Sequence, residues 1–551
     1  MYRRLISTVA VAALAIGLAF LYELPGASKA KQPTGNPHAL VPPGLFATAD
    51  ACMSCHNGLT TPSGRDLSFG ADWRASMMAN SARDPYWQAA VRREVIDHPQ
   101  AQRAIEDECS TCHMPMARFE AHARGEEGKI FAHLPIGQAA SRADRLAADG
   151  VSCTMCHQIE SGNFGTRESF VGGFEVDTTS PMGQRRVFGP YSVDQGRTTI
   201  MHSASGFRQE QSTHVQQSEL CATCHTLYTE ARGPEGEVLG ELPEQVPYLE
   251  WRHSAYREEQ SCQSCHMPVV QDSVPIAGVM GQPRANVSRH TFRGGNFFML
   301  RMLNRYRGEL GVTALPQELS ESARRTEEHL QSSTARVSVE TPEVEGGRLQ
   351  TAVEIENLAG HKLPTAYPSR RVWIHLTVRD QNGSVVFESG GFKPSGAIAG
   401  NDNDADASTY EPHYTEITRE GQVQVYEAIM ATPEGEVTTG LLSAVRFVKD
   451  NRLLPRGFDK STAEEDIAVQ GAAATDTSFT GGGDRVRYAV DVGEARGPFR
   501  VEAELWYQPI AYRWAQNLEA YDAMETNRFV RYYDSMSTGS GTVLARGTAT
   551  Q

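Results

Sequence analysis

Five copies of one short pattern constrain this chain more than any other feature. Each copy reads Cys-x-x-Cys-His, and the five begin at residues 52, 109, 153, 221 and 262. Two thiols at this spacing with a histidine directly after them are the signature of covalent haem c attachment. The thiols form thioethers with the haem vinyl groups, and the histidine is the proximal iron ligand. The predicted attachment residues are Cys52, Cys55, Cys109, Cys112, Cys153, Cys156, Cys221, Cys224, Cys262 and Cys265, and the predicted proximal ligands are His56, His113, His157, His225 and His266.

Two other kinds of site use paired cysteines. Zinc sites and thioredoxin-like dithiols also contain Cys-x-x-Cys. The chain of 551 residues has ten cysteines, and the five motifs contain all ten, so none is left for a disulfide or a further zinc ligand. Every pair is also followed directly by histidine. The sequence therefore predicts five covalent haems c.

The N-terminus indicates the compartment. Arg3 and Arg4 precede an apolar run from Leu5 to about Tyr22, and a small-residue stretch at 28–30 follows. This is the layout of a secretory signal peptide. The run is also nearly long enough to span a bilayer, so an uncleaved membrane anchor is the competing interpretation. Both place the rest of the chain in the periplasm or another extracytoplasmic compartment, where haem c is attached.

The segments between the motifs are mostly helical in pattern. Apolar spacing predicts helices over 73–79, 87–96 and 296–306 and a polar helix over 319–333, whereas the Gly-rich stretch 151–191 predicts long loops. The unequal spacing of the motifs excludes a tandem-repeat array. We expect an α-rich multihaem cytochrome domain with long loops.

After residue 333 the apolar period changes to two. Val372, Ile374, Leu376 and Val378 alternate with other residues, and Asn382-Gly383 then supplies a hairpin turn. The alternation returns over 486–492 and 499–505, which predicts an all-β, sandwich-like domain. The expected organisation is a signal peptide or anchor over 1–30, a linker over 31–50, a pentahaem domain over 51–333 and a β-domain over 334–551.

The sixth iron ligand decides between electron transfer and catalysis, because a filled iron passes electrons and an open one binds substrate. The chain has 17 histidines, five of them in the motifs. Sequence context favours four others: one shortly before the fourth motif, one within a Trp-x-x-Ser element, one preceding paired glycines and one in a loop between predicted strands. A methionine after the first motif is a fifth candidate, with core packing as its alternative. These candidates are His202, His253, His290, His361 and Met78.

Charge and composition bound the partners. The formal net charge of −15 argues against nucleic acid and fits redox partner proteins, either quinol-linked or other cytochromes. Membrane contact is expected only through the N-terminal anchor. Residues 401–406 offer closely spaced oxygen ligands for Ca²⁺, but they lack the downstream glutamate of an EF-hand loop, and a solvated loop is the competing interpretation.

Several of these motifs resemble a known family. Cys-x-x-Cys-His-Met-Pro at 109 and 262, Trp-x-x-Ser at 73 and 251, and His-x-Phe-x-Gly-Gly at 290 resemble the multihaem c-type cytochromes. That family includes hydroxylamine oxidoreductase, pentahaem nitrite reductase and the tetrahaem cytochromes of ammonia oxidisers. The resemblance covers about residues 45–310 and implies haems held in close stacked pairs. Segments 360–365 and 449–455 look like those of multihaem cytochromes fused to a β-domain.

The chain also departs from the family. Many relatives have histidine where this chain has Met78, and the nitrite reductases have a Cys-x-x-Cys-Lys motif that is absent here. The favoured function is therefore electron transfer along a chain of haems, with no catalytic residue assigned. The alternative is a reductase of a nitrogen oxide or another small oxyanion at one five-coordinate haem, so whether the chain is an enzyme is left open.

Overall fold

The structure is a computed structural model that describes residues 44–551. The predicted signal peptide or anchor and most of the predicted linker lie outside these residues. Within the described part, no helix is both long and apolar enough to cross a membrane.

Each Cys-x-x-Cys-His motif lies on a short helix. The five are α1 (Asp50–His56), α4 (Gln102–His113), α7 (Cys153–Cys156), α9 (Ser218–His225) and α11 (Cys262–His266), and each ends at the motif histidine or directly before it. One helical turn brings residues i, i+3 and i+4 to the same face. The two thiols and the imidazole of each motif therefore share one face, as haem attachment requires.

The remaining helices of this region connect and cover the motifs. The predicted helix over 87–96 lies within α3 (Pro85–Asp97), 296–306 corresponds to α12 (Phe297–Arg305), and 319–333 corresponds to α13 (Pro316–Ser333). The others are α2 (Phe69–Arg74), α5 (Pro115–His122), α6 (Arg142–Ala148), α8 (Gln195–Ser205) and α10 (Pro247–Arg252). Four two-stranded sheets accompany them: β1 (Arg186–Gly189) with β2 (Arg208–Gln211), β3 (Leu227–Arg232) with β4 (Val238–Gln245), β5 (Val269–Val270) with β8 (Val287–Ser288), and β6 (Val274–Pro275) with β7 (Pro283–Arg284).

The predicted helix over 73–79 is wrong beyond Arg74. Helix α2 ends there, and residues 75–80 form turns. The Ser76 hydroxyl donates to the Trp73 carbonyl, and the Asn80 amide donates to the carbonyls of Arg74 and Ser76. These local side-chain bonds replace the backbone bonds that would continue the helix.

Two five-stranded sheets dominate the C-terminal region. The first has the order β10 (Glu343–Glu345), β11 (Arg348–Asn357), β19 (Gly483–Asp491) and β14 (Glu416–Ile417), with β9 (Ala335–Val339) also paired to β11. The second has the order β13 (Val385–Ser389), β12 (Arg371–Arg379), β20 (Arg500–Gln508) and β21 (Thr542–Thr550), with β15 (Val425–Tyr426) also paired to β12. A smaller sheet has the order β17 (Val437–Thr438), β16 (Ala428–Ala431) and β18 (Arg446–Asp450). The alternating segments around 372, 486 and 499 are therefore strands, as predicted.

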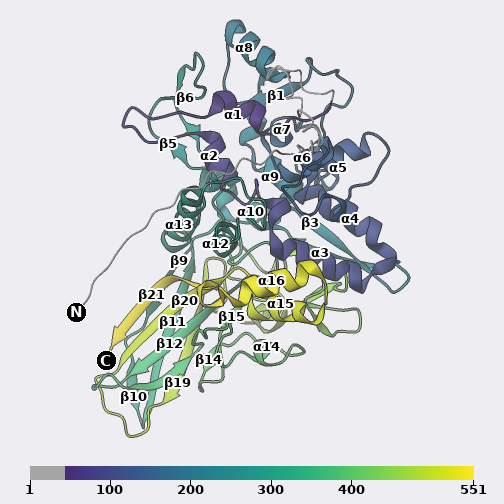
Figure 1. Cartoon of the computed structure of the whole chain (residues 1–551). Helices are drawn as coiled ribbons and strands as arrows, with labels where there is room; N and C mark the ends of the chain where they lie inside the picture. The colour runs from purple at the N-terminus through teal and green to yellow at the C-terminus, as the bar shows by residue number, and fades with distance from the viewer. Residues whose placement is uncertain (1–43) are drawn as a thin grey trace, which may run out of the picture. The chain divides into compact units, whose positions relative to one another are not determined.

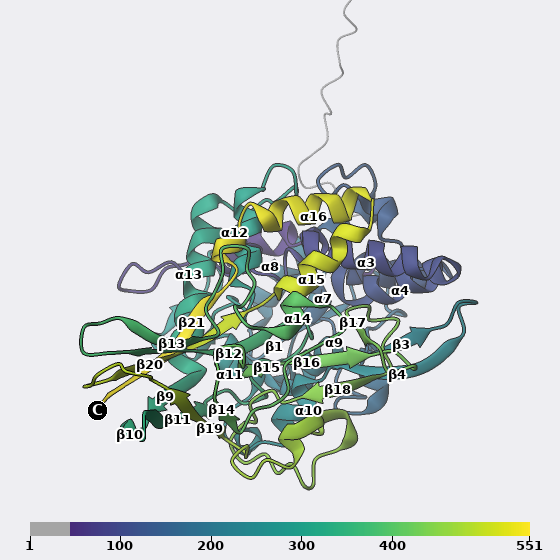
Figure 2. The ribbon, with the colours of Figure 1, turned by 90° about the horizontal axis from the view of Figure 1, so that it is seen from below.

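The prediction of an all-β C-terminal region is wrong. It also contains α14 (Asp402–Ala405), α15 (Tyr512–Gln516) and α16 (Met524–Asp534). Figure 1 shows α16, in yellow, beside α3 of the motif region, and Figure 2 shows the same neighbours from below. Arg92 of α3 forms an ion pair with Glu525 of α16 at 2.9 Å. The C-terminal chain thus returns to cover the motif region.

The change from helix to strand falls at residue 334, between α13 and β9. The largest hydrophobic cluster contains residues from both sides of this point, among them Leu300 and Leu303 of α12 and Val353 and Leu376 of the two large sheets. The two regions therefore share a core. The domain boundary near 333 stays a prediction.

Candidate functional site

The motif cysteines are free and only partly buried. All ten have intermediate exposure, and none is paired in a disulfide. Free, partly accessible thiols in Cys-x-x-Cys-His motifs fit covalent attachment of haem c.

Four of the five motif histidines are oriented in the same way. Their Nδ1 atoms hydrogen-bond to backbone carbonyls far away in the sequence: His56 to Ile276 at 2.6 Å, His113 to Ser81 at 2.9 Å, His157 to Phe188 at 2.6 Å, and His266 to Arg293. A carbonyl only accepts, so Nδ1 carries the proton and Nε2 presents a lone pair. This is how proteins orient an imidazole that ligates a metal through Nε2. His225 has no such Nδ1 partner within residues 44–551.

Burial keeps these imidazoles neutral. It is the largest cause of the lowered pKa of all five motif histidines, and the pKa of His113 and of His266 falls to about 4. A protonated imidazole cannot ligate a metal. The five side chains are therefore in the ligating protonation state at neutral pH.

The sulfur atoms connect the motifs to one another. The thiols of Cys52 and Cys153, of Cys112 and Cys224, and of Cys221 and Cys262 lie within hydrogen-bonding reach of each other. In the haem-attached protein these atoms are thioether sulfurs, so the contacts report position alone. Burial and, after it, nearby Cys224 raise the pKa of Cys156 to about 12, which places the third motif beside the fourth. All five motifs therefore form one connected series with the fourth at its branch point.

Two of the five candidate sixth ligands face a motif histidine. The His290 ring lies 6.3 Å from the His157 ring, and the His361 ring lies 6.3 Å from the His266 ring, with interplanar angles of 21° and 13°. A metal–imidazole nitrogen bond is about 2 Å long, so two rings that share an iron have centroids about 6 Å apart. Both pairs have the separation of axial ligands on one iron.

The protonation and contacts of these two histidines agree with that geometry. Burial first, and the charge of His157 next, lower the pKa of His290 to about 3. Its Nδ1 is buried and makes no hydrogen bond to a described residue, although the Ser288 carbonyl lies near the ring. His361 Nδ1 donates to the Lys362 carbonyl at 2.9 Å, which leaves its Nε2 free.

Within residues 44–551, neither the His202 ring nor the His253 ring pairs with a motif histidine. His202 Nε2 donates to the Gly183 carbonyl at 2.7 Å, and His253 contacts the Phe458 ring, with centroids 4.9 Å apart. Met78 packs against an apolar cluster that includes Phe46 and Trp87 and that also contacts three motif cysteines, Cys109, Cys156 and Cys224.

His329 is a residue that sequence reasoning missed. It lies on α13, and its ring centroid is 6.2 Å from that of His266 at an interplanar angle of 72°. Burial first, and then Arg293, lower its pKa to about 4. The helical pattern offered a signal, because His329 follows buried Thr326 by three residues and precedes buried Leu330.

Tyr86 of α3 and Tyr367 of the C-terminal region pack together, and Arg370 follows Tyr367 by three residues. Tyr86 and Tyr367 meet edge to face with ring centroids 5.9 Å apart, and burial raises the pKa of both phenols. Burial and, after it, the charge of Arg370 lower the pKa of His225, so this guanidinium lies near the fourth motif. No ring of another histidine pairs with His225 among the described residues. Sequence reasoning missed this group, because its members lie in two separate segments around residues 86 and 367–370.

Two carboxylates of the predicted Ca²⁺ loop are engaged by protein donors. The Asp404 carboxylate pairs with Arg371 at 2.7 Å and accepts from the Ile398 backbone N–H, while Asp406 accepts from Ser408. Within residues 44–551, no aspartate of 401–406 belongs to a group of three converging metal-ligand side chains.

A buried cluster of His413, Asp476 and Asp484 has metal-ligand residue types. The Gln424 and Asn451 amides both donate to His413 Nδ1, at 2.8 and 3.1 Å. Their oxygens accept backbone N–H bonds, which fixes the direction of both amides. His413 therefore carries its proton on Nε2 and donates it to Asp476 at 3.0 Å, so the cluster is a closed hydrogen-bond network.

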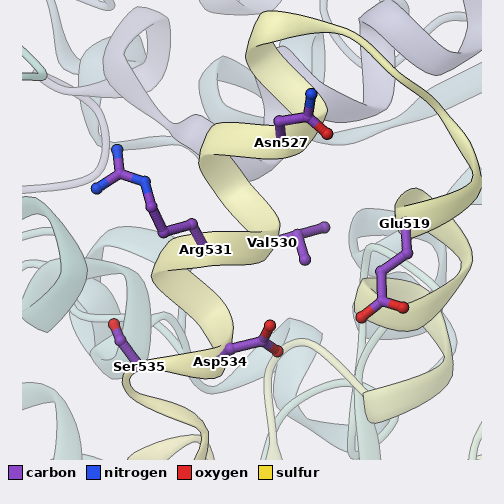
Figure 3. Close-up of a pocket in the computed structure, with 6 residues that line it drawn as sticks. All are labelled: Glu519, Asn527, Val530, Arg531, Asp534 and Ser535. Carbon is purple, nitrogen blue, oxygen red and sulfur yellow. The ribbon is translucent and has the colours of Figure 1, made fainter.

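An open hollow lies along α16 (Figure 3). Its labelled residue Arg531 pairs with Glu309 at 2.8 Å, and none of its lining residues comes from a Cys-x-x-Cys-His motif. The hollow is therefore separate from the motif chemistry.

Comparisons with known proteins agree with the class that the motifs indicate. The chain has a multihaem cytochrome c-like fold. It is similar to the crystal structure of a penta-haem cytochrome c552 from Thermochromatium tepidum, with a TM-score of 0.53, 16% sequence identity, and coverage of 92% of this chain and 99% of that chain. No protein-family model and no curated protein matches the sequence. At this identity the likeness establishes the fold alone.

Proposed function

We propose that this chain is a periplasmic or otherwise extracytoplasmic pentahaem cytochrome c that transfers electrons along its haems to and from redox partner proteins. The observation that carries the proposal is the connected series of five motifs with two histidine pairs at axial-ligand separation. Haem c supplies a one-electron couple when bound. An iron with two imidazole ligands has no open position and is suited to electron transfer.

The chain's own residues prepare these sites. The ten motif cysteines attach the haems, and His56, His113, His157, His225 and His266 are the proximal ligands of this proposal. His290 and His361 are the proposed sixth ligands opposite His157 and His266. Backbone carbonyls fix the tautomer of four proximal imidazoles, and burial keeps them unprotonated. These features support ligation at neutral pH without any side-chain proton release.

Two alanine variants test the electron-transfer proposal. His290→Ala and His361→Ala should each convert one low-spin haem of the oxidised protein to high-spin, measured by electron paramagnetic resonance on the fully loaded chain. His202→Ala is the matched control and should leave the spectrum unchanged. An unchanged low-spin count in both test variants would reject the proposed ligands.

Reduction of a small oxyanion is the second candidate function. The observation that favours it is the position of Arg370 near His225 of the fourth motif, a histidine whose ring pairs with no other histidine within residues 44–551. Tyr367, three residues before Arg370, packs against Tyr86. A guanidinium binds oxyanions through several N–H donors, and phenols with a raised pKa remain proton donors at neutral pH. Such groups near an open iron would suit anion binding.

Anion titration separates the two functions. If the second candidate is right, nitrite perturbs a high-spin signal of the wild-type protein, and Arg370→Met weakens that binding at least tenfold. Arg336→Met, on the exposed surface of β9, is the control. A protein that lacks any high-spin signal and any nitrite response is an electron carrier only.

A further inference from the structure

A buried network of four charges lies directly beside His361. Its members are Glu250 of α10 in the motif region and Lys362, Asp450 and Arg452 of the C-terminal region. The side chains of Glu250 and Lys362 are 0% exposed, that of Asp450 3% and that of Arg452 6%. Two positive and two negative groups balance, so the network carries no net charge. This network joins the sequence segments 360–365 and 449–455 to each other and to the motif region.

Asp450 lies at the centre of the network. Lys362 Nζ donates to its carboxylate at 2.7 Å, and Arg452 donates to it through Nε at 2.8 Å and through Nη2 at 2.7 Å. Arg452 Nη1 lies 3.0 Å from Glu250 Oε1, a charge contact that is not aligned as a hydrogen bond. Leu363 and Leu453 exchange two backbone hydrogen bonds of 2.9 Å. The two C-terminal segments are thereby fixed side by side.

The network reaches His361 through Lys362. The Lys362 N–H donates to Glu250 Oε2 at 3.1 Å, and the Lys362 carbonyl accepts the Nδ1–H of His361 at 2.9 Å. The His361 carbonyl in turn accepts from the buried Asn357 amide at 3.0 Å. Lys362 is therefore held by its ammonium group and its N–H, and the imidazole is held by Lys362. Lys362 thus links the His361 imidazole to the buried charges.

Energetics give the network a positional role. Removing four charges from water carries a large desolvation cost, and a buried ion pair is often no more stabilising than apolar residues of the same volume. A buried network is better suited to selecting one conformation than to raising stability. Here the conformation it selects is that of loop 360–365, which carries the histidine.

We infer that Glu250, Lys362, Asp450 and Arg452 are positioning residues that hold His361 as the sixth ligand of the fifth haem. The inference rests on the proposed haem binding. The C-terminal region is then part of the electron-transfer site, because it supplies both the ligand and the charges that place it. Loss of the network should free the imidazole without removing any attachment cysteine.

Lys362→Met tests this inference, because methionine has a similar length and no charge. The loaded variant should keep five haems by intact mass, and one low-spin haem should become high-spin in the oxidised spectrum, as in His361→Ala. The matched control is Lys449→Met, which removes another buried lysine whose ammonium group bonds to the Val425 carbonyl and Glu427, each at 2.9 Å, and to none of the four network residues. The control should keep the wild-type spin distribution.

The outcomes separate the two levels of the proposal. Five haems with an unchanged low-spin count in Lys362→Met would overturn the positioning role and leave haem binding intact. The same spectral change in Lys449→Met would also overturn it, because the effect would then be general. Fewer than five haems in the wild-type protein would contradict the proposed function instead. Should Lys362→Met fail to accumulate, Glu250→Gln is measured in the same way with the same expected conversion.

Discussion

The motif region and the C-terminal region use their buried polar groups differently. In the C-terminal region, Arg371 pairs with Asp404 at 2.7 Å and Lys449 pairs with Glu427 at 2.9 Å, so these buried charges are neutralised within the protein. In the motif region, His56 and His157 use Nδ1 for a carbonyl, and within residues 44–551 their Nε2 atoms have no hydrogen-bond partner. Buried polar groups normally have partners. The motif histidines therefore keep one nitrogen available for a further ligand.

Buried carboxylates with a raised pKa occur in both regions. Glu244 of β4 is 4% exposed and accepts from the Thr229 hydroxyl at 2.5 Å, yet it has no cationic partner among the described residues. Burial raises its pKa to about 7 and also raises that of nearby Glu94. In the C-terminal region, burial likewise raises the pKa of Asp484 to about 6.

Removal of whole motifs tests this contrast with the largest expected effect. Cys221→Ser with Cys224→Ser deletes attachment at the branch point of the series and should abolish accumulation of folded protein. Cys52→Ser with Cys55→Ser deletes a terminal motif and should leave a folded protein with four haems. Yield and intact mass measure both. Equal yields of the two variants would contradict the branched arrangement.

A buried ion pair tests the C-terminal region. Arg371→Met leaves Asp404 as an unpaired buried charge, which costs about 3–5 kcal/mol of unfolding free energy. Denaturant unfolding followed by far-UV circular dichroism measures this loss. The haem count should stay at five, since Arg371 touches no motif. A lost haem would show that this ion pair also supports a haem site of the motif region.

The pH dependence of stability tests Glu244. Its pKa is about 7 in the folded protein and about 4.3 in an unfolded chain. Between pH of about 4.3 and 7, the folded protein therefore keeps a proton on Glu244 that the unfolded chain has released. Stability is therefore lost as pH rises through about 7. Glu244→Gln should raise the unfolding free energy at pH 8 by about 4 kcal/mol and leave it unchanged at pH 4. A gain of equal size at both values would point to packing instead of ionisation.

The smallest effects are expected at two candidates that pack against apolar or aromatic side chains. Met78→Leu and His253→Ala should leave the haem count and the low-spin spectrum unchanged, because Met78 packs in an apolar cluster and His253 against Phe458. Electron paramagnetic resonance spectra of the haem-loaded variants check this. A new high-spin signal in either variant would show that the replaced residue ligates a haem iron.

The sequence predicted features that depend on neighbouring residues better than features that depend on contacts between distant segments. Motif helices and alternating strands depend on neighbouring residues, and both are readable from spacing. Sixth ligands depend on contacts between distant segments, so local context indicated His290 and His361 but also favoured His202, which bonds to Gly183 instead. His329 was missed because nothing in its immediate sequence resembles a haem motif.

Long-range packing also explains the missed helices of the C-terminal region. Period-two alternation predicted the strands of this region. Helix α16, in contrast, packs against α3, which lies more than 400 residues earlier in the chain. Phe529 of α16 meets Tyr86 of α3 with ring centroids 5.1 Å apart. No local pattern specifies such a partner, because the helix is amphipathic without indicating which surface it covers.

The intact mass of the mature chain, produced with c-type maturation and measured after acid–acetone extraction, tests the central claim most directly. Extraction removes non-covalent haem, so the excess over the apo mass counts only thioether-attached groups. The account predicts an excess of five haem masses, because all ten cysteines lie in the five motifs. An excess of four or fewer would contradict the account and exclude at least one motif from the series.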